Sequence, residues 1–350
     1  MNEEKIDKKN ILIQDFEEIL ENKSIKWKNF KNKTFLLTGA NGFIATYIMH
    51  FLIFLNEELN FNIKLIIISK NKKKFKSNFE NVFKRMHIHF IEQDVSDKIK
   101  ISKNTKIDFI LHAASKASPK LFNKSPIETI LPNIFGTYNL LKISCDKKIK
   151  SFIFFSSGEI YGDHTEIVDE NNLSYFNHLN NRASYAESKK MGETLCYSFF
   201  KQKNIPIKIL RLFHTYGPCM NLNDERVMMD FVKSIITQKK ILLRSNGNQK
   251  RSFCYIADVV KGIFILLSSG KNGEAYNLAN PKETITIKQL ALKLAKNNNV
   301  KLNKFINKKS KLTNFVKNAI PSIKKINALG FDPTTSIDKG FKRTIKYFSK

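Results

Sequence analysis

Cysteine is scarce in this chain, and its spacing excludes the two chemistries that it usually signals. The four cysteines, Cys145, Cys196, Cys219 and Cys254, form no Cys-x-x-Cys pair. Neither a zinc site nor a disulfide framework is therefore predicted, and we expect no metal. A reducing, cytoplasmic location suits such thiols. The polar, acidic opening Asn2-Glu3-Glu4 is also unlike a signal peptide.

Long hydrophobic runs are missing too. The longest, from about Tyr47 to Leu55, contains His50 and is too short to cross a bilayer. We therefore expect no membrane insertion. The hydrophobic content of 42% and the 29 phenylalanines are instead typical of a globular chain.

Acidic residues are outnumbered, because 31 Asp and Glu face 60 Lys and Arg, for a formal charge of +29. Such a charge often indicates nucleic-acid binding. Here the basic residues are spread over the chain, and only Lys70 to Lys76 form a tight cluster. No zinc-finger, RNA-recognition or basic-zipper pattern accompanies them. We therefore expect no nucleic-acid partner, and a charge that attracts an anionic small molecule.

Strand and helix patterns alternate from Thr34 onward. The predicted strands are apolar and β-branched without polar alternation, which is typical of a parallel sheet covered on both faces. They are Thr34–Thr38, Lys64–Ser69, His87–Glu92, Phe109–Ala113, Phe152–Ser156 and Ile207–Phe213. Helices are predicted between them, including Phe43–Leu55, Asn133–Cys145 and Ala183–Gln202. This repetition predicts an α/β fold, a doubly wound parallel Rossmann sheet with a smaller C-terminal lobe.

A glycine-rich turn, Thr38-Gly39-Ala40-Asn41-Gly42-Phe43-Ile44-Ala45, joins the first predicted strand to the first long helix. Gly39 permits the tight turn, and Gly42 lets backbone N–H groups approach a pyrophosphate at the helix N-terminus. Ala45 is the small residue where helix and strand pack closely. In this strand–turn–helix context the pattern predicts dinucleotide binding. Asn41, Phe43 and Ile44 are then expected to line the cofactor.

The second predicted strand ends without the carboxylate that ordinarily binds an adenosine ribose. Ser69, Lys70 and Asn71 stand there instead. Nearby cations tolerate a 2′-phosphate, so these residues leave both NAD and NADP open. Residues that follow or end two further strands are also expected beside the cofactor. They are Asp94 and Val95, past the third strand, and Ala113, Ala114 and Ser115, at the end of the fourth.

Three units are predicted from these patterns. Residues 1–33 form an N-terminal helical extension, since Ile11, Phe16 and Ile19 recur at helical spacing, and it packs on the domain or on a neighbouring subunit. Residues 34–213, with about 253–269, form the NAD(P)-binding Rossmann domain. Residues 214–252 and 270–350 form the smaller substrate-binding lobe, because the strand–helix rhythm changes after His214.

The stretch Tyr185-Ala186-Glu187-Ser188-Lys189 places a phenol and an ammonium one helical turn apart on one face. Lys189 and a positively charged nicotinamide are expected to lower the pKa of Tyr185 from about 10, so that it serves as a base. Ser157 follows another predicted strand and is placed to hydrogen-bond the same substrate hydroxyl. Glu159 is expected to handle a second proton.

Taken together, these motifs resemble an extended short-chain dehydrogenase/reductase of the nucleotide-sugar epimerase/dehydratase family, over about residues 34–345. Within that family the resemblance is greatest to the UDP-glucuronate decarboxylase (UDP-xylose synthase) branch. The supporting stretches are Ala113–Pro119, Asn133–Thr137, Ser156–Gly162, Arg182–Lys189, Arg211–Pro218, Asn223–Phe231 and Gln249–Asp258. Members of this family use NAD that is reduced and reoxidised within one turnover, so the resemblance puts NAD ahead of NADP.

The resemblance also implies roles for individual residues. Tyr185 is the base at the sugar 4-hydroxyl, Lys189 binds the nicotinamide ribose, and Ser157 and Glu159 complete the catalytic set. Further cofactor contacts are expected from Asn133, Ser156 and His214. The expected substrate contacts are Ser118, Glu159, Arg182, His214, Arg226, Arg244 and Arg251. A homodimer formed through the helices Asn133–Cys145 and Ala183–Gln202 is implied as well.

The reaction that this resemblance implies begins with oxidation of the sugar C4 hydroxyl to a transient ketone. If C5 carries a carboxylate, the product is a β-keto acid that loses CO2. Protonation at C5 and return of the hydride then give a UDP-pentose, so decarboxylation of UDP-glucuronate to UDP-xylose is the leading prediction. NDP-sugar 4-epimerisation comes second and NDP-sugar 4,6-dehydration last.

Departures from the family pattern set this order. Dehydratases carry Asp-Glu where this chain has Gly158-Glu159, and glycine cannot protonate a departing 6-hydroxyl. Decarboxylases carry Thr-Ser-Glu at residues 157–159, so Gly158 is expected to widen the pocket, which favours the sugar rotation of a 4-epimerase. His214 replaces a usual Asn and Cys219 a usual Arg. The nucleotide base and the sugar stay open.

Overall fold

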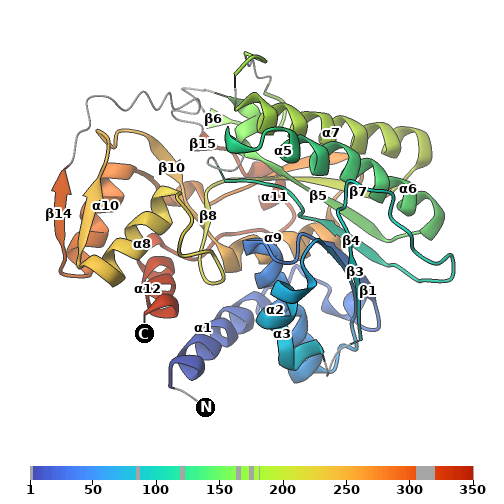
Figure 1. Ribbon diagram of the computed structural model, residues 1–350, viewed down its shortest axis with the longest axis horizontal. Helices are drawn as coiled ribbons and strands as arrows, with labels where there is room; N and C mark the ends of the chain where they lie inside the picture. The colour runs from blue at the N-terminus through green and yellow to red at the C-terminus, as the bar shows by residue number, and fades with distance from the viewer. Residues whose placement is uncertain are drawn as a thin grey trace.

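The computed structural model describes residues 3–83, 87–118, 123–162, 167–172, 177–180, 182–304 and 320–349. Its centre is a sheet of seven strands in the order β12-β7-β5-β4-β1-β2-β3 (Figure 1). Every neighbouring pair in it is parallel. The strands are β1 (Thr34–Thr38), β2 (Lys64–Ser69), β3 (Ile88–Glu92), β4 (Phe109–His112), β5 (Ser151–Ser157), β7 (Ile207–Leu212) and β12 (Glu274–Leu278). This is the doubly wound α/β fold that the sequence predicts. The chain changes direction between β1 and β4, which is where such sheets bind ligands.

Helices cover both faces of the sheet, because successive residues of each buried strand point to opposite sides. Leu36 packs into the core beneath α6 (Thr137–Lys147) and α7 (Ala183–Lys203). Phe35 and Leu37 pack into the core beneath α2 (Phe43–Leu59), α3 (Lys72–Phe83) and α9 (Ile256–Ser269). Figure 1 shows α6 and α7 above the sheet, and α2 and α3 below it. Among the described residues, no helix has the length and apolar character that a bilayer crossing requires.

The remaining elements are short or belong to a second group beside the sheet, at the left of Figure 1. That second group includes α8 (Val227–Gln238), β9 (Lys240–Leu243), α10 (Ile287–Asn297), β14 (Lys301–Lys304) and α12 (Ile337–Phe348). The other elements are η1 (Trp27–Phe30), α5 (Ile127–Leu131), the π-turn η2 (Pro132–Gly136), η3 (Gly158–Tyr161), β6 (Ile167–Val168), β8 (Thr215–Tyr216), β10 (Lys250–Ser252), β11 (Cys254–Tyr255), η4 (Pro281–Glu283), β13 (Thr284–Thr286), β15 (Ile320–Pro321) and α11 (Lys324–Asn327).

One predicted boundary is wrong. The sequence analysis places all of residues 270–350 in the smaller lobe, but β12 pairs in parallel with β7 and forms the edge of the large sheet. The strand Glu274-Ala275-Tyr276-Asn277-Leu278 is half polar and lacks the apolar run that marks the other strands. Its place in the sheet depends on pairing with a distant segment, which local sequence does not reveal.

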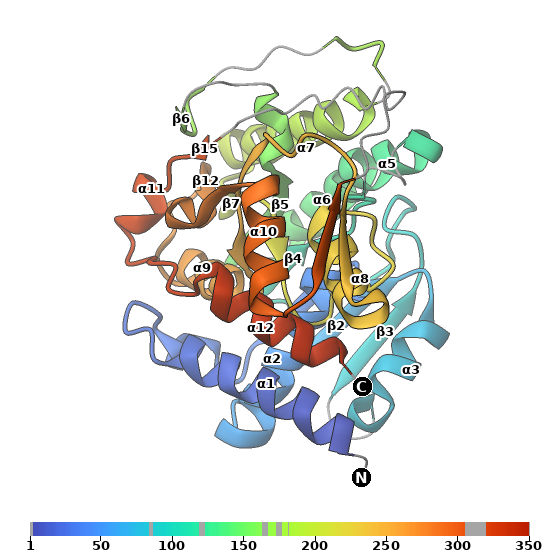
Figure 2. The same cartoon turned by 90° about the vertical axis from the view of Figure 1, so that its left-hand side faces the viewer.

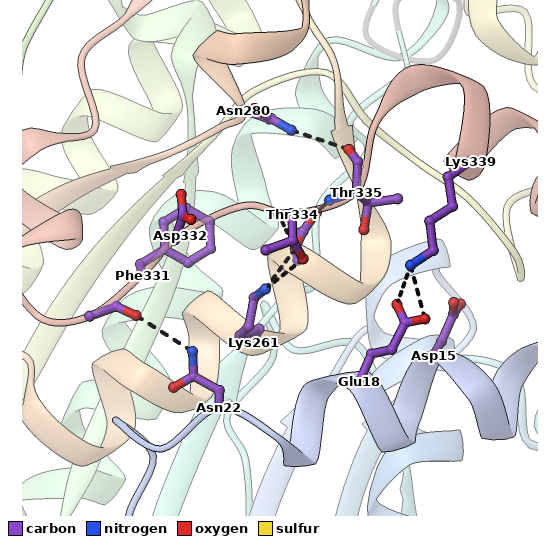
Figure 3. Close-up of polar contacts among 12 residues, drawn as sticks. Asp15, Glu18, Asn22, Lys261, Asn280, Phe331, Asp332, Thr334, Thr335 and Lys339 are labelled. Carbon is purple, nitrogen blue, oxygen red and sulfur yellow. Dashed lines mark hydrogen bonds and ion pairs between the residues drawn. The ribbon is translucent and has the colours of Figure 1, made fainter.

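The predicted N-terminal helix is present as α1 (Glu3–Leu20), and it packs on α9, α12 and α2 of its own chain. Figure 2 shows α1 beside α2 and below α12. Glu18 pairs with Lys339 of α12, and Asp15 lies next to it (Figure 3). The buried Asp15 accepts hydrogen bonds from Tyr47, Tyr255 and Arg343 at 2.9, 2.8 and 2.7 Å. The extension thus ties the start and the end of the chain together.

Candidate active site

The glycine turn has the backbone geometry that a dinucleotide site needs. Gly39 has a φ of +71°, and a Cβ there would lie 2.8 Å from the Cα of Ala114, so only glycine fits. Gly42 is the N-cap of α2 and offers no side chain to its first amides. These amides and the positive end of the helix are therefore free to receive a pyrophosphate.

A buried hydrogen-bond chain that the sequence analysis missed supports this turn. Burial lowers the pKa of His112 to about 3, so its imidazole is neutral. Its Nε2 faces the Pro132 carbonyl at 3.2 Å and donates to it, so Nδ1 accepts from Thr38 Oγ1 at 2.9 Å. Thr38 Oγ1 in turn accepts from the Ala114 N–H. The sequence feature that could have indicated this chain is a histidine at the end of an apolar strand.

Two adjoining cavities open at the carboxyl ends of the strands. The larger, of about 490 Å³, runs from the glycine turn to Tyr185 and Lys189. The smaller, of about 160 Å³, holds Ser157, Glu159 and His214. Residues lining both include Phe43, Ile44, Ser156, Tyr185 and Arg226. The larger cavity also takes in Gly39, Asn41, Gly42, Ala113, Ser115 and Ser118.

Two polar atoms in the larger cavity suit a dinucleotide. Asn41 Oδ1 and Ser115 Oγ are buried without a hydrogen-bond partner. Buried polar groups normally have partners, so a ligand with hydroxyl and phosphate groups is the natural complement. Together with the glycine turn, these orphaned atoms fit NAD.

Tyr185 lies where the two cavities meet, and its side chain is almost wholly buried. Burial raises the pKa of Tyr185 to about 12, and a hydrogen bond from Ser157 opposes that rise. The predicted lowering by Lys189 is therefore not present in the chain by itself. Desolvation is the largest influence on this pKa, and the groups that lower it are Ser157 and Arg226. Lys189 Nζ donates instead to the Phe155 carbonyl at 2.5 Å.

Lys189 is also buried, with its Nζ over the ring faces of Phe154 and Tyr185 at 5.0 and 5.9 Å from their centroids. Burial lowers the pKa of Lys189 to about 7, while the charge of Glu193 opposes this shift. The ammonium and its neutral form are thus close in free energy at neutral pH.

Glu159 lines the smaller cavity and is held by Arg182, whose Nη2 donates to Glu159 Oε2 at 2.8 Å. Its backbone N–H donates to Ser157 Oγ at 3.2 Å. Ser157 therefore touches both Tyr185 and the segment that carries Glu159. The predicted catalytic set of Tyr185, Lys189, Ser157 and Glu159 is brought together at one place.

Gly158 does not widen the pocket. A Cβ at this position would lie 2.4 Å from the ring of Phe213, so the aromatic ring already fills the space that a side chain would use. The prediction of a wider pocket is wrong for this reason, and it no longer supports sugar rotation.

The predicted substrate arginines differ in position. Arg226 lines both cavities, and Asp224 binds its guanidinium through two hydrogen bonds of 3.0 and 2.8 Å. Arg244 is largely exposed and pairs with Asp230, and neither Arg244 nor Arg251 is among the residues that line the two cavities.

His214 is held in a left-handed conformation, with a φ of +28°. Burial, with the charges of Arg251 and Arg226, lowers its pKa far below the ordinary value, so the imidazole is neutral. A neutral imidazole is suited to a hydroxyl or amide partner, and the two arginines carry the positive charge.

Four other predicted cofactor residues, Lys70, Asp94, Val95 and Asn133, are not among the residues that line the two cavities. Lys70 pairs with Asp94, and Val95 is buried against Gly136. Asn133 is buried, and its amide donates to Ser188 Oγ of α7 at 2.9 Å. Pro119 of the Ala113–Pro119 stretch lies outside the described residues.

The sequence analysis missed several residues that line the larger cavity, including Thr46, Lys74, Asn78, Leu212 and Asn221. Of these, only Lys74 carried a signal, as part of the lysine cluster.

The fold and this site define an α/β dinucleotide-binding enzyme with a buried Tyr-x-x-x-Lys pair. The profile of the NAD dependent epimerase/dehydratase family matches residues 35–279. The chain therefore belongs to that family, and it is an NAD-dependent enzyme.

Two proteins similar to this chain are named UDP-glucuronic acid decarboxylase. UDP-glucuronic acid decarboxylase 1 of Xenopus tropicalis is 30% identical over 325 residues, which are 91% of this chain and 72% of the relative. UDP-glucuronic acid decarboxylase 6 of Arabidopsis thaliana is 32% identical over 264 residues, which are 74% and 73% of the two chains. Among solved structures, UDP-glucuronic acid 4-epimerase from Bacillus cereus, in complex with UDP-glucuronic acid and NAD, is 25% identical. It aligns with a TM-score of 0.73 over 90% of this chain and 98% of its own.

Proposed function

We propose that this enzyme binds NAD and converts UDP-glucuronate to UDP-xylose and CO2. The observation that carries the proposal is the set Tyr185, Ser157 and Glu159 lining a small cavity that shares lining residues, Tyr185 among them, with the larger cavity of the glycine turn. The relatives named UDP-glucuronic acid decarboxylase support the choice of substrate and reaction.

NAD, when bound, accepts the hydride from C4 of the sugar and later returns it. Gly39, Asn41, Gly42 and Ser115 would hold it in the larger cavity. The side chains of the protein orient the sugar and move the protons.

Tyr185 takes the proton of the 4-hydroxyl as general base, while Ser157 hydrogen-bonds the phenol oxygen of Tyr185. Since burial raises the pKa of Tyr185 to about 12, nearby positive charge must offset the desolvation before the phenolate forms at neutral pH. Lys189 supplies such charge from the same helix.

The 4-ketone lies β to the C5 carboxylate, so the C5–carboxylate bond breaks with its electron pair delocalised into the ketone. CO2 leaves, a proton is added at C5, and the 4-hydroxyl is restored by the hydride and the proton held on Tyr185. Arg226 faces both cavities and is the cation best placed to balance the diphosphate or carboxylate charge.

We also propose that residues 214–252 and the C-terminal elements beside the sheet form the substrate lobe.

The alternative is 4-epimerisation of the same sugar nucleotide, and the Bacillus cereus 4-epimerase supports it. Dehydration is disfavoured because Gly158 leaves no acid beside Glu159.

Incubation of the purified chain and NAD with UDP-glucuronate, UDP-glucose, UDP-N-acetylglucosamine and dTDP-glucose tests the proposal by mass spectrometry. We expect UDP-glucuronate alone to lose the mass of CO2. Loss of water from any substrate, or an unchanged mass with a new retention time, would replace decarboxylation with dehydration or epimerisation. The Tyr185→Phe variant should retain NAD binding and lose turnover by about 10²–10⁴-fold.

We propose a homodimer through α5, η2, α6 and α7, and a cytoplasmic location. Five large hydrophobic residues are exposed on these elements, namely Ile127, Phe135, Tyr138, Met191 and Tyr197. All four cysteines are free thiols, which suits a reducing compartment. Light scattering should give twice the chain mass, and Phe135→Glu with Tyr197→Glu should give a monomer. Leu292→Glu, an exposed leucine of α10, should leave the dimer intact.

A further inference from the structure

Glu193 lies on α7, four residues after Lys189 and eight after Tyr185, so all three share one helix face. Its carboxylate is almost buried, with 12% of the side chain exposed. Oε1 accepts a hydrogen bond of 2.5 Å from Ser156 Oγ, and Oε2 accepts one of 2.7 Å from Arg211 Nη2. The side chain therefore connects α7 to the ends of β5 and β7.

Ser156 makes this connection relevant to catalysis. It lines both cavities, and it directly precedes Ser157, which hydrogen-bonds the Tyr185 phenol. Anchoring Ser156 to Glu193 fixes the end of β5 and, through it, the position of Ser157.

Lys189 gives Glu193 a second role. The Nζ of Lys189 donates to a neutral carbonyl, that of Phe155, and the residue as a whole is 2% exposed. An isolated buried ammonium is costly, and the charge of Glu193 is the strongest influence that favours it. Arg211 neutralises part of this charge from the other side.

The charged and titratable groups around Lys189 come from three elements. They are Tyr185, Glu193 and Cys196 of α7, His112 of β4 and Arg211 of β7. Burial keeps His112 neutral and raises the pKa of Cys196 well above its ordinary value, so neither carries charge at neutral pH. Glu193, which pairs with Arg211, is the carboxylate of this set.

We propose that Glu193 is a positioning residue of the reaction, which anchors Ser156 behind the catalytic serine and sets the charge of Lys189. The inference rests on the proposed roles of Tyr185 and Lys189. It assigns the control of those roles to a carboxylate that lines neither of the two cavities.

The test compares Glu193→Gln, which keeps the shape and loses the charge, with the wild type. The matched control is Glu187→Gln, because Glu187 lies on the same helix and pairs with Lys190 away from the site. Competitive acetylation of the full chain without substrate, followed by mass spectrometry of the peptides, measures the pH at which Lys189 becomes a free amine. We expect that midpoint to fall by about one unit in Glu193→Gln and to stay constant in the control.

The pH dependence of kcat/KM gives a second readout. Activity needs the ammonium, so it is lost as pH rises through the pKa of Lys189. The alkaline limb should therefore move to lower pH by the same amount in Glu193→Gln, and Glu193→Asp, which keeps the charge, should restore it. An unchanged midpoint and limb, with only a lower melting temperature, would reduce Glu193 to a structural partner of Arg211.

A second variant, expected to shift the Lys189 midpoint in the opposite direction, keeps the proposal testable if the Glu193→Gln chain does not fold. Arg211→Gln removes the cation that neutralises Glu193, so the Lys189 midpoint should rise, and no rise would contradict the proposal. The labelling needs no substrate. If the midpoints shift as expected but no sugar nucleotide reacts, the proposed function fails while the role of Glu193 stands.

Discussion

Tyr185 sits in an environment that, in the chain alone, keeps it protonated at neutral pH, because burial raises its pKa to about 12. Ser157 opposes this rise through a hydrogen bond. A hydroxyl that donates to a phenolate stabilises the charged form, so the serine assists deprotonation. At the residue scale, the proposed role of Tyr185 as base thus depends on how far a few neighbours offset the cost of burying the phenolate charge.

Ser157→Ala tests this balance. Removing the hydrogen bond raises the pKa of Tyr185, so the acid limb of the kcat/KM profile should move to higher pH and kcat should fall by about 10-fold or more. Ser144→Ala, which removes a buried hydroxyl on α6, is the control and should leave the profile unchanged. An unmoved acid limb in Ser157→Ala would show that the serine does not act on the phenol.

Gly158→Ala tests the contact with Phe213. Because the added methyl would lie 2.4 Å from the ring, the substitution should lower the free energy of unfolding by about 1–3 kcal/mol. Urea unfolding measures the loss. Phe213→Leu in the same chain should recover part of it, since contacting residues are not additive, and a fully additive pair would contradict the packing argument.

At the scale of elements, helix α1 connects three parts of the chain through the side chain of Asp15. Asp15 receives hydrogen bonds from Tyr47 of α2, Tyr255 of β11 and Arg343 of α12. The N-terminal end of α2, four residues before Tyr47, lines the cofactor cavity at Phe43. A segment outside the matched family residues 35–279 therefore fastens the nucleotide-binding helix to the C-terminal helix.

Asp15 should make stability depend on pH. Burial, the largest cause, outweighs the opposing charge of Arg343 and raises the pKa of Asp15 from 3.8 to about 7. Between these values the folded chain holds a proton that the unfolded chain has released, so this group contributes less stability as pH rises from 4 towards about 7. Thermal melts should therefore show the wild type losing its advantage over Asp15→Asn between about pH 4 and 7. An advantage that grows with pH would instead indicate an ionised Asp15 paired with Arg343.

At the scale of the whole molecule, a formal charge of +29 on 350 residues creates a positive field. The proposed substrate carries a diphosphate and a carboxylate, so long-range attraction should speed its capture. The two cavities meet at one edge of the sheet, where Arg226 faces both.

Ionic strength separates capture from chemistry. Raising salt from about 0.05 to 0.5 M shortens the Debye length from more than 10 Å to less than 5 Å. We expect kcat/KM for UDP-glucuronate to fall several-fold while kcat changes little. A constant kcat/KM would show that the distributed lysines do not steer the substrate.

The features that the sequence predicts depend on short-range patterns, and those that it does not predict depend on contacts between distant residues. The turn at Gly39 and Gly42, the Tyr185–Lys189 pair and six of the seven strands are short-range patterns, so the sequence alone predicts them. Three features join residues far apart in the chain: the pairing of β12 with β7, the ring of Phe213 against Gly158, and the His112 chain beneath the turn.

The sequence by itself therefore determined the fold class, the dinucleotide turn and the Tyr185–Lys189 pair, because each depends on local periodicity or spacing. The tertiary structure decided which of the candidate arginines faces the cavities, that the space beside Gly158 is filled, and how burial moves the pKa values of Tyr185 and Lys189. These properties arise from desolvation and from contacts across the chain, which exist only once distant segments have packed together.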